Sequence, residues 1–492
     1  MTILNLAVLA GLPAGVTRPD YDPTSVRIGH IHLGIGAFHR AHQAVYTDDL
    51  LRADPRWAIC GANLPAPLSI DALKSQDGLY TVLEKSSDGV RPRVIGSLRE
   101  ALFLGTERAR LMARFADPAV KVVTMTVTEK GYCHDPATGK LNPAHPDIVR
   151  DRGQPALAVS APGVLTAGLA ARRAAGAGPI TVVCCDNLPH NGHLVEGMVG
   201  AFAQSVDAAL ADWIGRHVTF PCTMVDRIVP ATTPADVAEA ARLLGVDDAV
   251  PVAAEPFRQW VIEDRFAAER PPWETVGAEF TNDVGSYETM KLRLLNGSHS
   301  TLAYLGFLAG FETIWQASAD PDLARLVERQ MAEEIVPTVV APAGVDLHAY
   351  ARMLLVRFRN TALPHRTQQI AMDGSQKLPQ RLLNTVRDRM QGGGSYAHLA
   401  LAVAGWIRYC AGVDEAGRPI VVSDPLATTF AEIAGRAGGD PVRLAAGFLD
   451  LTAVFGADLS AHADFRAAVT RNVEALWRHG VRKTLVAHLG AG

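Results

Sequence analysis

The chain of 492 residues lacks an excess of either charge, because 47 Lys and Arg face 51 Asp and Glu, for a formal net charge of −4. No global positive field therefore attracts it to nucleic acid or to an anionic membrane surface. No segment reaches the roughly 18 uninterrupted apolar residues of a membrane span, and no basic leader precedes the short apolar stretch near the N-terminus. These absences predict a cytoplasmic protein without nucleic-acid or membrane partners.

Cysteine is also scarce, with six residues scattered along the chain and no CxxC pair. This usage is typical of a reducing compartment. Four histidines crowd the N-terminal region, at His30, His32, His39 and His42, but no Cys or carboxylate cluster completes a tetrahedral zinc set. We therefore predict no metal site, and we interpret these histidines as structural or as lining a cofactor.

Hydrophobic residues make up 48% of the chain, so it can bury a large core. Its 492 residues are too many for one compact domain. Short apolar runs alternate with amphipathic stretches at 28–36, 57–64, 120–131 and 179–187, which indicates a parallel sheet with helical crossovers. From about residue 287 onward the segments are long and helically periodic. The pattern predicts an α/β domain over residues 1–284, followed by a mainly α-helical domain over residues 285–492.

The first apolar run ends in a glycine-containing turn, with Gly34 and Gly36 directly before the stretch AFHRAHQAVYTDDLL. Such glycines let a backbone turn tightly and approach a pyrophosphate, while the N-terminus of the next helix offers free N–H groups. The third glycine position holds His39, and ordinary βα turns share this pattern. Its place after the first strand of an alternating α/β half favours a nucleotide site.

The second strand lacks the acidic residue that often holds the adenosine ribose, and it offers only Asn63 there. No arginine stands nearby to pair with a 2′-phosphate. The sequence therefore favours NAD over NADP.

Four polar residues lie on one predicted helix, at Glu288, Lys291, Asn296 and His299. At about 100° per residue these positions fall within an arc of roughly 140°. Burial lowers the pKa of a lysine, so that it can take an alcohol proton, and amide donors can hold the alkoxide oxygen. A solvated polar face is the alternative, but the intervening leucines favour a stripe that faces a cleft.

Asp186 and Asn187 follow the apolar run at 179–185, in the sequence CDNLPHNG. Side chains at the carboxyl end of a parallel strand lie where such sheets bind ligands. Asp-Asn before Pro is also common turn chemistry, so both interpretations stay open.

A late segment concentrates cations around a Pro and a Gly-Ser turn, at Arg357, Arg359, His365, Arg366 and Lys377. Such a loop can hold a substrate carboxylate. Basic clusters are also often solvated surface.

Six blocks, at residues 34–43, 126–132, 185–192, 220–230, 291–300 and 373–381, together resemble the polyol-specific long-chain dehydrogenases, the mannitol dehydrogenase family. The blocks recur in the family's order over nearly the whole chain. The resemblance implies an N-terminal Rossmann-type domain that binds NAD, a mostly helical C-terminal domain and a cleft between them. It also implies a small-molecule sugar or sugar-acid substrate and metal-independent chemistry.

The resemblance also implies roles for single residues. Lys291 would be the general base, Asn187 and Asn296 would hold the reacting oxygen, and His299 would orient the substrate or the lysine. Glu288 would lie on the proton path, and Asp226 and Lys377 would contact substrate, with His365 and Arg366 beside them. The cofactor would contact Gly34, Gly36, Ala37, Phe38, Arg40, Asn63, Thr128 and Glu129.

Within the family the chain looks most similar to the fructuronate reductase branch, which interconverts D-fructuronate and D-mannonate. Mannitol-type members tend to carry Asp-Thr where this chain has Arg366-Thr367, and an arginine near Gln369. A mannitol or arabinitol 2-dehydrogenase is the alternative enzyme. A non-catalytic NAD-binding sensor is the third, but it would need neither Lys291 nor Asn296.

Overall fold

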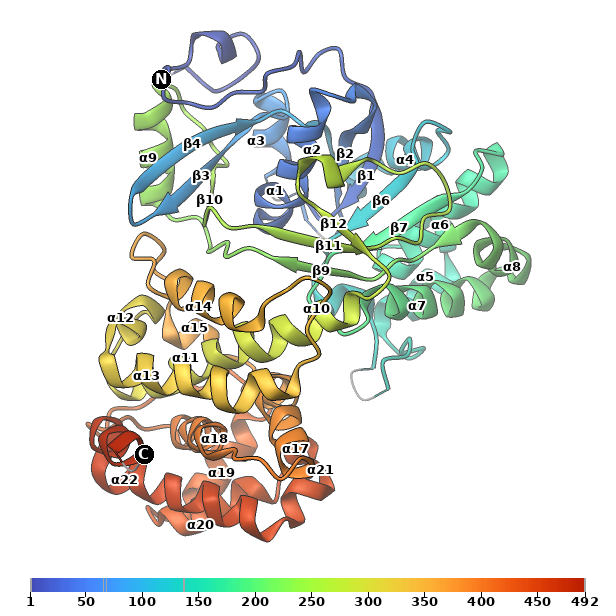
Figure 1. Ribbon diagram of the computed structural model, residues 1–492. Coiled ribbons are helices and arrows are strands. Elements are labelled where there is room, and N and C mark those ends of the chain that lie inside the picture. Colours follow the sequence, from blue (N-terminus) through green and yellow to red (C-terminus); the bar gives the residue numbers. More distant parts are fainter. Residues whose placement is uncertain (1, 65, 68, 136–137, 491–492) are drawn as a thin grey trace. The chain divides into compact units, whose positions relative to one another are not determined.

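The computed structural model describes residues 2–64, 66–67, 69–135 and 138–490 (Figure 1). The chain divides into two compact units, Met1–Gly285 and Ser286–Gly492. Unit 1 is an α/β unit and unit 2 is helical, so the predicted fold class is confirmed.

The main sheet of unit 1 has six parallel strands in the order β5-β2-β1-β6-β7-β8. Counted along the chain, these strands take the positions 3-2-1-4-5-6 of a doubly wound dinucleotide-binding fold. The strands are β1 (Ile28–Leu33), β2 (Ala58–Asn63), β5 (Leu98–Phe103), β6 (Val122–Met125), β7 (Ile180–Cys184) and β8 (Val218–Thr219).

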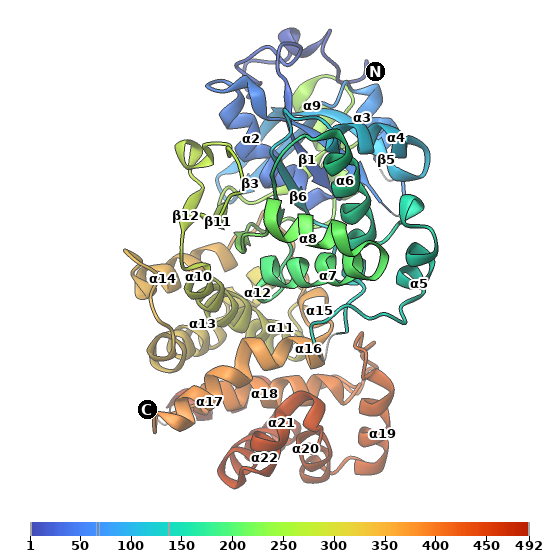
Figure 2. The ribbon, with the colours of Figure 1, turned by 90° about the vertical axis from the view of Figure 1, so that its right-hand side faces the viewer.

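Both faces of this sheet are buried, which is why its strands read as continuous apolar runs. Val123 and Val182 pack with the helices of one face, whereas Val122 and Val183 pack into the cluster on the other face. Figure 2 shows the helices of the first face lying together. They are α4 (Leu104–Phe115), α6 (Ala161–Ala175), α7 (Asn191–Val206) and α8 (Ala208–His217).

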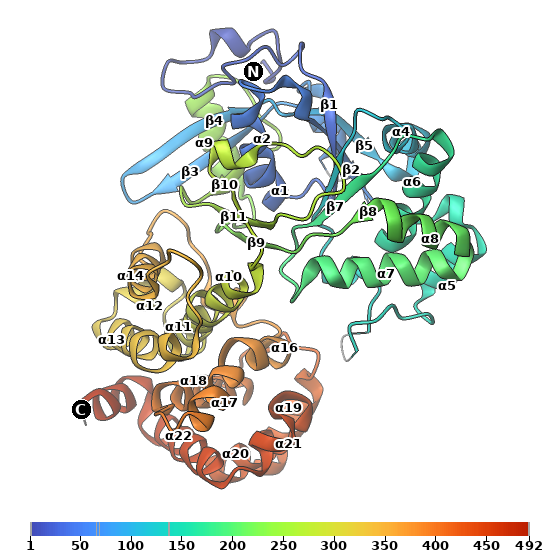
Figure 3. The same cartoon turned by 45° about the vertical axis from the view of Figure 1, so that its right-hand side comes forward.

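Two small sheets complete unit 1, and Figure 3 shows the hairpin of one of them projecting beside α9 (Pro234–Leu244). The first contains β3 (Tyr80–Ser86), β4 (Gly89–Ile95) and β10 (Val252–Ala254), and the second β9 (Thr223–Asp226), β11 (Gln259–Glu263) and β12 (Glu279–Thr281). The remaining helices are α1 (Ala37–Ala41), α2 (Gln43–Leu51), α3 (Ile70–Ser75) and α5 (Pro146–Gly153).

Unit 2 is built around α18 (Ala397–Cys410), in which every residue from His398 onward is buried. It packs against α11 (Ser298–Leu308) and the long α22 (Ala463–Gly490). The other helices are α10 (Val284–Met290), which begins at the end of unit 1, α12 (Ile314–Ala319), α13 (Pro321–Arg329), α14 (Leu347–Phe358), α15 (Thr367–Ile370), α16 (Gly374–Leu378), α17 (Asn384–Gln391), α19 (Ala427–Ala437), α20 (Pro441–Leu449) and α21 (Thr452–Ala461).

Among the described residues, no single helix has the length and apolar character to cross a membrane. Helices α20 and α21 taken together have the length and composition of a membrane span, but they are bent by 102° relative to one another.

Candidate active site

The turn after β1 lies at the point where the strand order of the main sheet reverses, between β1 and β6. Gly34 has φ +97°, and a Cβ added there would lie 2.1 Å from the carbonyl oxygen of Thr126. Only glycine fits, because this position has both a left-handed backbone and a close neighbour. Gly34 therefore serves the approach of two loops of the protein itself.

Gly36 has a different setting, since the nearest atom to an added Cβ lies 4.0 Å away. The first hydrogen bond of α1 runs from the N–H of Arg40 to the carbonyl of Gly36, at 3.2 Å. The amides of Ala37 and Phe38 precede that bond and point out of the N-terminal end of the helix. Open space and outward N–H groups fit a dinucleotide pyrophosphate.

The helix after the turn is short. It ends at Ala41, because His42 takes φ −126° and ψ −89° and donates its N–H to His39, at 3.1 Å. The chain then begins α2 at Gln43. The dipole of α1 is therefore that of five residues, and the backbone N–H groups are its main contribution to anion binding.

Two polar side chains fix the loops at this edge of the sheet. The carboxamide oxygen of Asn63 accepts the N–H of Ile35, at 2.7 Å, so the end of β2 holds the glycine turn. The carboxylate of Asp186 accepts the N–H of Val127, at 2.9 Å, and the hydroxyl of Tyr132, at 2.6 Å. The loops after β1, β2, β6 and β7 are thereby tied together.

Two of the predicted cofactor residues, Arg40 and Thr128, differ in exposure. Arg40 is buried, donates to the carbonyl of Val250 and lies over the ring of Tyr80, so its side chain supports the turn from within unit 1. Thr128 is exposed at φ +67°, a conformation that is unusual for a side chain branched at Cβ. The side chain of Glu129 lies outside the described part of the chain.

The four N-terminal histidines are fully buried beneath the glycine turn. His30 and His32 each bond the hydroxyl of Thr124, at 2.6 and 2.7 Å, and the ring of His32 stacks on His39 with centroids 3.3 Å apart. Burial lowers the pKa of His30 and of His42 to about 3, so these rings are neutral at neutral pH.

In unit 2 the predicted catalytic helix contains a π-helical segment, η6 (Lys291–Gly297), between α10 and α11. The predicted arc assumed a uniform α-helix, and that assumption is wrong here, because π-helical bonds run from i to i+5. This segment packs closely against another. A Cβ at Gly297 would lie 2.7 Å from the carbonyl oxygen of Arg381, in a second π-helical segment, η9 (Pro379–Leu383).

The predicted catalytic residues of unit 2 differ in exposure. Lys291 is 7% exposed and His299 is 7% exposed, whereas Asn296 and Glu288 are partly exposed. The lysine is thus shielded from bulk water, and the amide and the carboxylate are accessible.

His299 lies in an aromatic and cationic setting. Its ring centroid is 4.9 Å from that of His365 and 5.2 Å from that of Phe358. Burial lowers its pKa well below the ordinary value, and the charges of His365, Arg381, Arg357 and Lys377 lower it further. Within the described residues its Nε2 atom is buried without a hydrogen-bond partner, so this neutral ring has one nitrogen available to a ligand.

The cations near His299 only partly match those that the sequence predicts. Lys377 is among the charges that act on His299, and its ammonium donates to the carbonyl of Met372, at 2.6 Å. Arg366 is exposed, and its predicted contact with substrate stays a prediction. Arg381 is also among the charges that lower the pKa of His299; the sequence analysis did not single it out, although it lies in the block at 373–381.

The other two predicted residues belong to unit 1. Asn187 is exposed in the loop after β7, and Asp226 is 4% exposed at the end of β9. Asp226 acts on the pKa of His42, so it lies close to the buried histidines.

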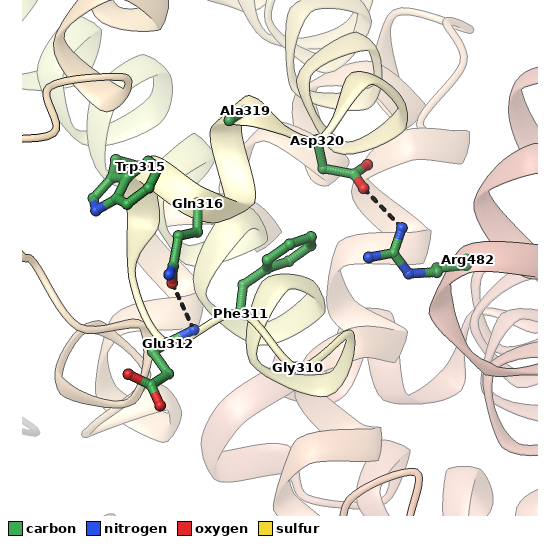
Figure 4. Close-up of a pocket in the computed structure, with 8 residues that line it drawn as sticks. All are labelled: Gly310, Phe311, Glu312, Trp315, Gln316, Ala319, Asp320 and Arg482. Carbon is green, nitrogen blue, oxygen red and sulfur yellow. Dashed lines mark hydrogen bonds and ion pairs between the residues drawn. The ribbon is translucent and has the colours of Figure 1, made fainter.

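A hollow of about 530 Å³ opens on unit 2 beside α12, and Figure 4 shows its lining side chains. Arg482 pairs with Asp320, at 3.1 Å, and lies 5.3 Å from the ring of Phe311. None of the predicted site residues lines this hollow, so we do not assign the active site to it.

A doubly wound sheet with an open glycine turn at its switch point, together with a helical unit that carries a buried lysine and histidine, defines a class of dinucleotide-dependent oxidoreductases. The mannitol dehydrogenase Rossmann domain matches residues 28–275, and the mannitol dehydrogenase C-terminal domain matches residues 283–477.

Individual relatives match along nearly the full length. D-mannonate oxidoreductase of Escherichia coli K12 is 48% identical over 96% of this chain and 98% of that protein. Mannitol 2-dehydrogenase of Cereibacter sphaeroides is 41% identical over 97% and 99%. The structure of Pseudomonas fluorescens mannitol 2-dehydrogenase with NAD and D-mannitol matches at a TM-score of 0.89 and 38% identity, with both chains covered at 100%. The chain belongs to the mannitol dehydrogenase family, as its sequence predicts.

Proposed function

We propose that this NAD-dependent oxidoreductase interconverts D-fructuronate and D-mannonate. The observation that carries the substrate assignment is the group of cations around His299, formed by Arg357, Arg381 and Lys377. A hexuronate brings a carboxylate that can pair with such cations, whereas a neutral sugar does not. The higher identity to D-mannonate oxidoreductase, 48% against 41% for a mannitol 2-dehydrogenase, supports the same assignment.

The residues of the glycine turn would hold NAD, which supplies the hydride acceptor for oxidation and the donor for reduction. Lys291 takes the proton from the substrate hydroxyl during oxidation and returns it during reduction. The amides of Asn296 and Asn187 donate hydrogen bonds to the oxygen on which negative charge develops. Glu288, which is partly exposed, passes the proton between Lys291 and solvent.

His299 orients the substrate through its unpartnered Nε2 atom. Because burial keeps its ring neutral, the imidazole can accept a hydrogen bond from a sugar hydroxyl without adding to the positive charge of the site. The neighbouring cations can then pair with the carboxylate of the substrate.

The chemistry needs no metal ion, because a lysine base and amide donors together supply both the proton transfer and the charge stabilisation. We expect dialysis against a strong chelator to leave turnover intact. Loss of turnover that zinc alone restores would contradict this part of the proposal.

Initial rates with NADH on fructuronate, tagaturonate, fructose and xylulose test the substrate. The proposal expects the highest kcat/KM on fructuronate. A preference for fructose would instead assign the chain as a mannitol 2-dehydrogenase, the alternative that the match to the Pseudomonas fluorescens enzyme favours.

A further inference from the structure

Three side chains of metal-ligand type meet on unit 1, although they are far apart in sequence. His193 lies in the first turn of α7, Cys222 directly precedes β9, and Glu263 ends β11. Their ligand atoms all lie within 4.8 Å of one another. We propose that these three residues bind a zinc ion that stabilises unit 1 and takes no part in hydride transfer.

The backbone holds Cys222 and Glu263 as a fixed pair. The N–H of Glu263 donates to the carbonyl of Cys222, at 2.9 Å, and continues the antiparallel pairing of β11 with β9. The N–H of Cys222 in turn donates to the Oε2 atom of Glu263, at 2.8 Å. An amide that orients a carboxylate in this way is typical of the surroundings of metal ligands.

The first turn of α7 is pinned to the same place. The side-chain amide of Asn191 donates to the carbonyl of Thr223, at 3.0 Å, and its oxygen accepts the N–H of Thr223, at 2.9 Å. A Cβ at Gly192 would lie 2.5 Å from the carbonyl oxygen of Phe220, so glycine permits this close packing. His193 follows directly and is exposed, which gives an ion a path to the buried thiol.

The separations suit zinc after small side-chain rotations. In a tetrahedral zinc site with bonds of 2.0–2.3 Å, ligand atoms lie roughly 3.3–3.8 Å apart, so a closure of about 1 Å is enough. A thiolate and an imidazole favour zinc over magnesium or calcium, which prefer oxygen ligands. Water completes the set, and Glu196, three residues after His193 on α7, offers a further carboxylate.

Arg265 already occupies the neighbourhood of the two carboxylates. It pairs with Glu196 at 3.4 Å and with Glu263 at 3.5 Å, and it donates to the carbonyl of Phe220 at 2.6 Å. Its positive charge opposes a second cation, so Arg265→Gln should bind zinc more tightly than the wild type. On binding, the thiol of Cys222 forms the Zn–S bond and loses its proton to solvent, so about one proton leaves per zinc at neutral pH.

A second group, Cys133, His145 and Asp147, has ligand atoms equally close together. Its members are engaged by other groups. His145 Nδ1 accepts the N–H of Asp147, Asp147 pairs with Arg150 at 3.0 Å, and burial raises the pKa of the Cys133 thiol to about 11. Cys133→Ser is therefore the matched control for Cys222→Ser.

The test titrates the chelator-treated full-length protein with cobalt(II) and with zinc. We expect one equivalent of cobalt(II) to give a thiolate-to-metal absorption band, and zinc to displace it and raise the melting temperature. Cys222→Ser should lose the band and the stabilisation. His193→Ala, a change at an exposed residue, should weaken metal binding at least tenfold, whereas Cys133→Ser should behave as the wild type.

Three results would overturn the proposal. The first is no stoichiometric binding to the wild type, and the second is a band that Cys133→Ser removes and Cys222→Ser keeps. The third is zinc bound at Cys222 on which turnover depends, because the proposed ion is structural. The binding and melting measurements need no sugar substrate, so the existence of the site is tested independently of the proposed function; only the third result depends on a turnover assay.

Discussion

Lys377 and Arg366 offer a matched test of substrate recognition, because both are cations of unit 2, Lys377 is among the charges that lower the pKa of His299, and Arg366 is exposed. Lys377→Met removes the charge and keeps most of the aliphatic stem. We expect this variant to lose kcat/KM on fructuronate and to change little on fructose, which carries no carboxylate. Arg366→Met should leave both substrates unaffected, since Arg366 is exposed.

The size of the effect follows from the setting of Lys377. A hydrogen bond to a charged group contributes about 1.5–3 kcal/mol. The side chain of Lys377 is 29% exposed, and Arg357 and Arg381 remain in the variant, so we take about 1.5–2 kcal/mol. At 1.36 kcal/mol for each factor of ten, kcat/KM on fructuronate should fall roughly 10- to 30-fold.

The assay measures kcat/KM for both substrates with NADH at fixed ionic strength, because salt screens partly exposed charges. The variant Lys377→Arg, which keeps the positive charge, should retain most of the wild-type activity on fructuronate. Thermal unfolding of each variant reports whether the fold is intact. A parallel loss on both substrates, or a selective loss in Arg366→Met alone, would refute the assignment of Lys377 to the carboxylate.

Three further predictions concern the cofactor turn and the chemistry. Lys291→Ala should lower kcat by ~10²–10⁴ with NADH affinity nearly unchanged, and near-normal turnover would exclude lysine as the base. Asn187→Ala and Asn296→Ala should each cost roughly 10²–10³ in kcat, with Asp worse at either position; equal activity of the Ala and Asp variants would place that side chain away from the reacting oxygen. Gly34→Ala should lower the melting temperature, because its Cβ meets a carbonyl at 2.1 Å, whereas Gly36→Ala should fold normally and weaken NADH binding. Fluorescence titration with NADH and thermal unfolding separate these two glycines, and the opposite pattern would reverse their roles.

The sheet was predictable because its central strands are buried on both faces. β1, β2, β6 and β7 read as short apolar runs that no other feature of the sequence imitates. β8 has only two residues and gives no such signal. The sheet of β9, β11 and β12 is built from strands of three to five residues, which give no such signal either.

The candidate site was predictable only where one short segment carries it. The glycine turn and the residues from Glu288 to His299 are local patterns. The π-helical segment has no such local pattern, and its close contact from Gly297 to Arg381 joins segments that are far apart in sequence. The group of His193, Cys222 and Glu263 likewise has no sequence signature, because three separate elements bring its members together.

The π-helical segment η6 makes the catalytic helix sensitive to changes in chain length. Deleting one residue between Lys291 and Gly297 would let i to i+5 bonds become i to i+4 bonds, and the helix would remain continuous. Because the wider π-helical turn takes up one extra residue, the helices on either side of the deletion would keep nearly the same relative rotation. The residues inside the segment, Asn296 among them, would change direction, so we expect a deletion that the fold tolerates to lower turnover.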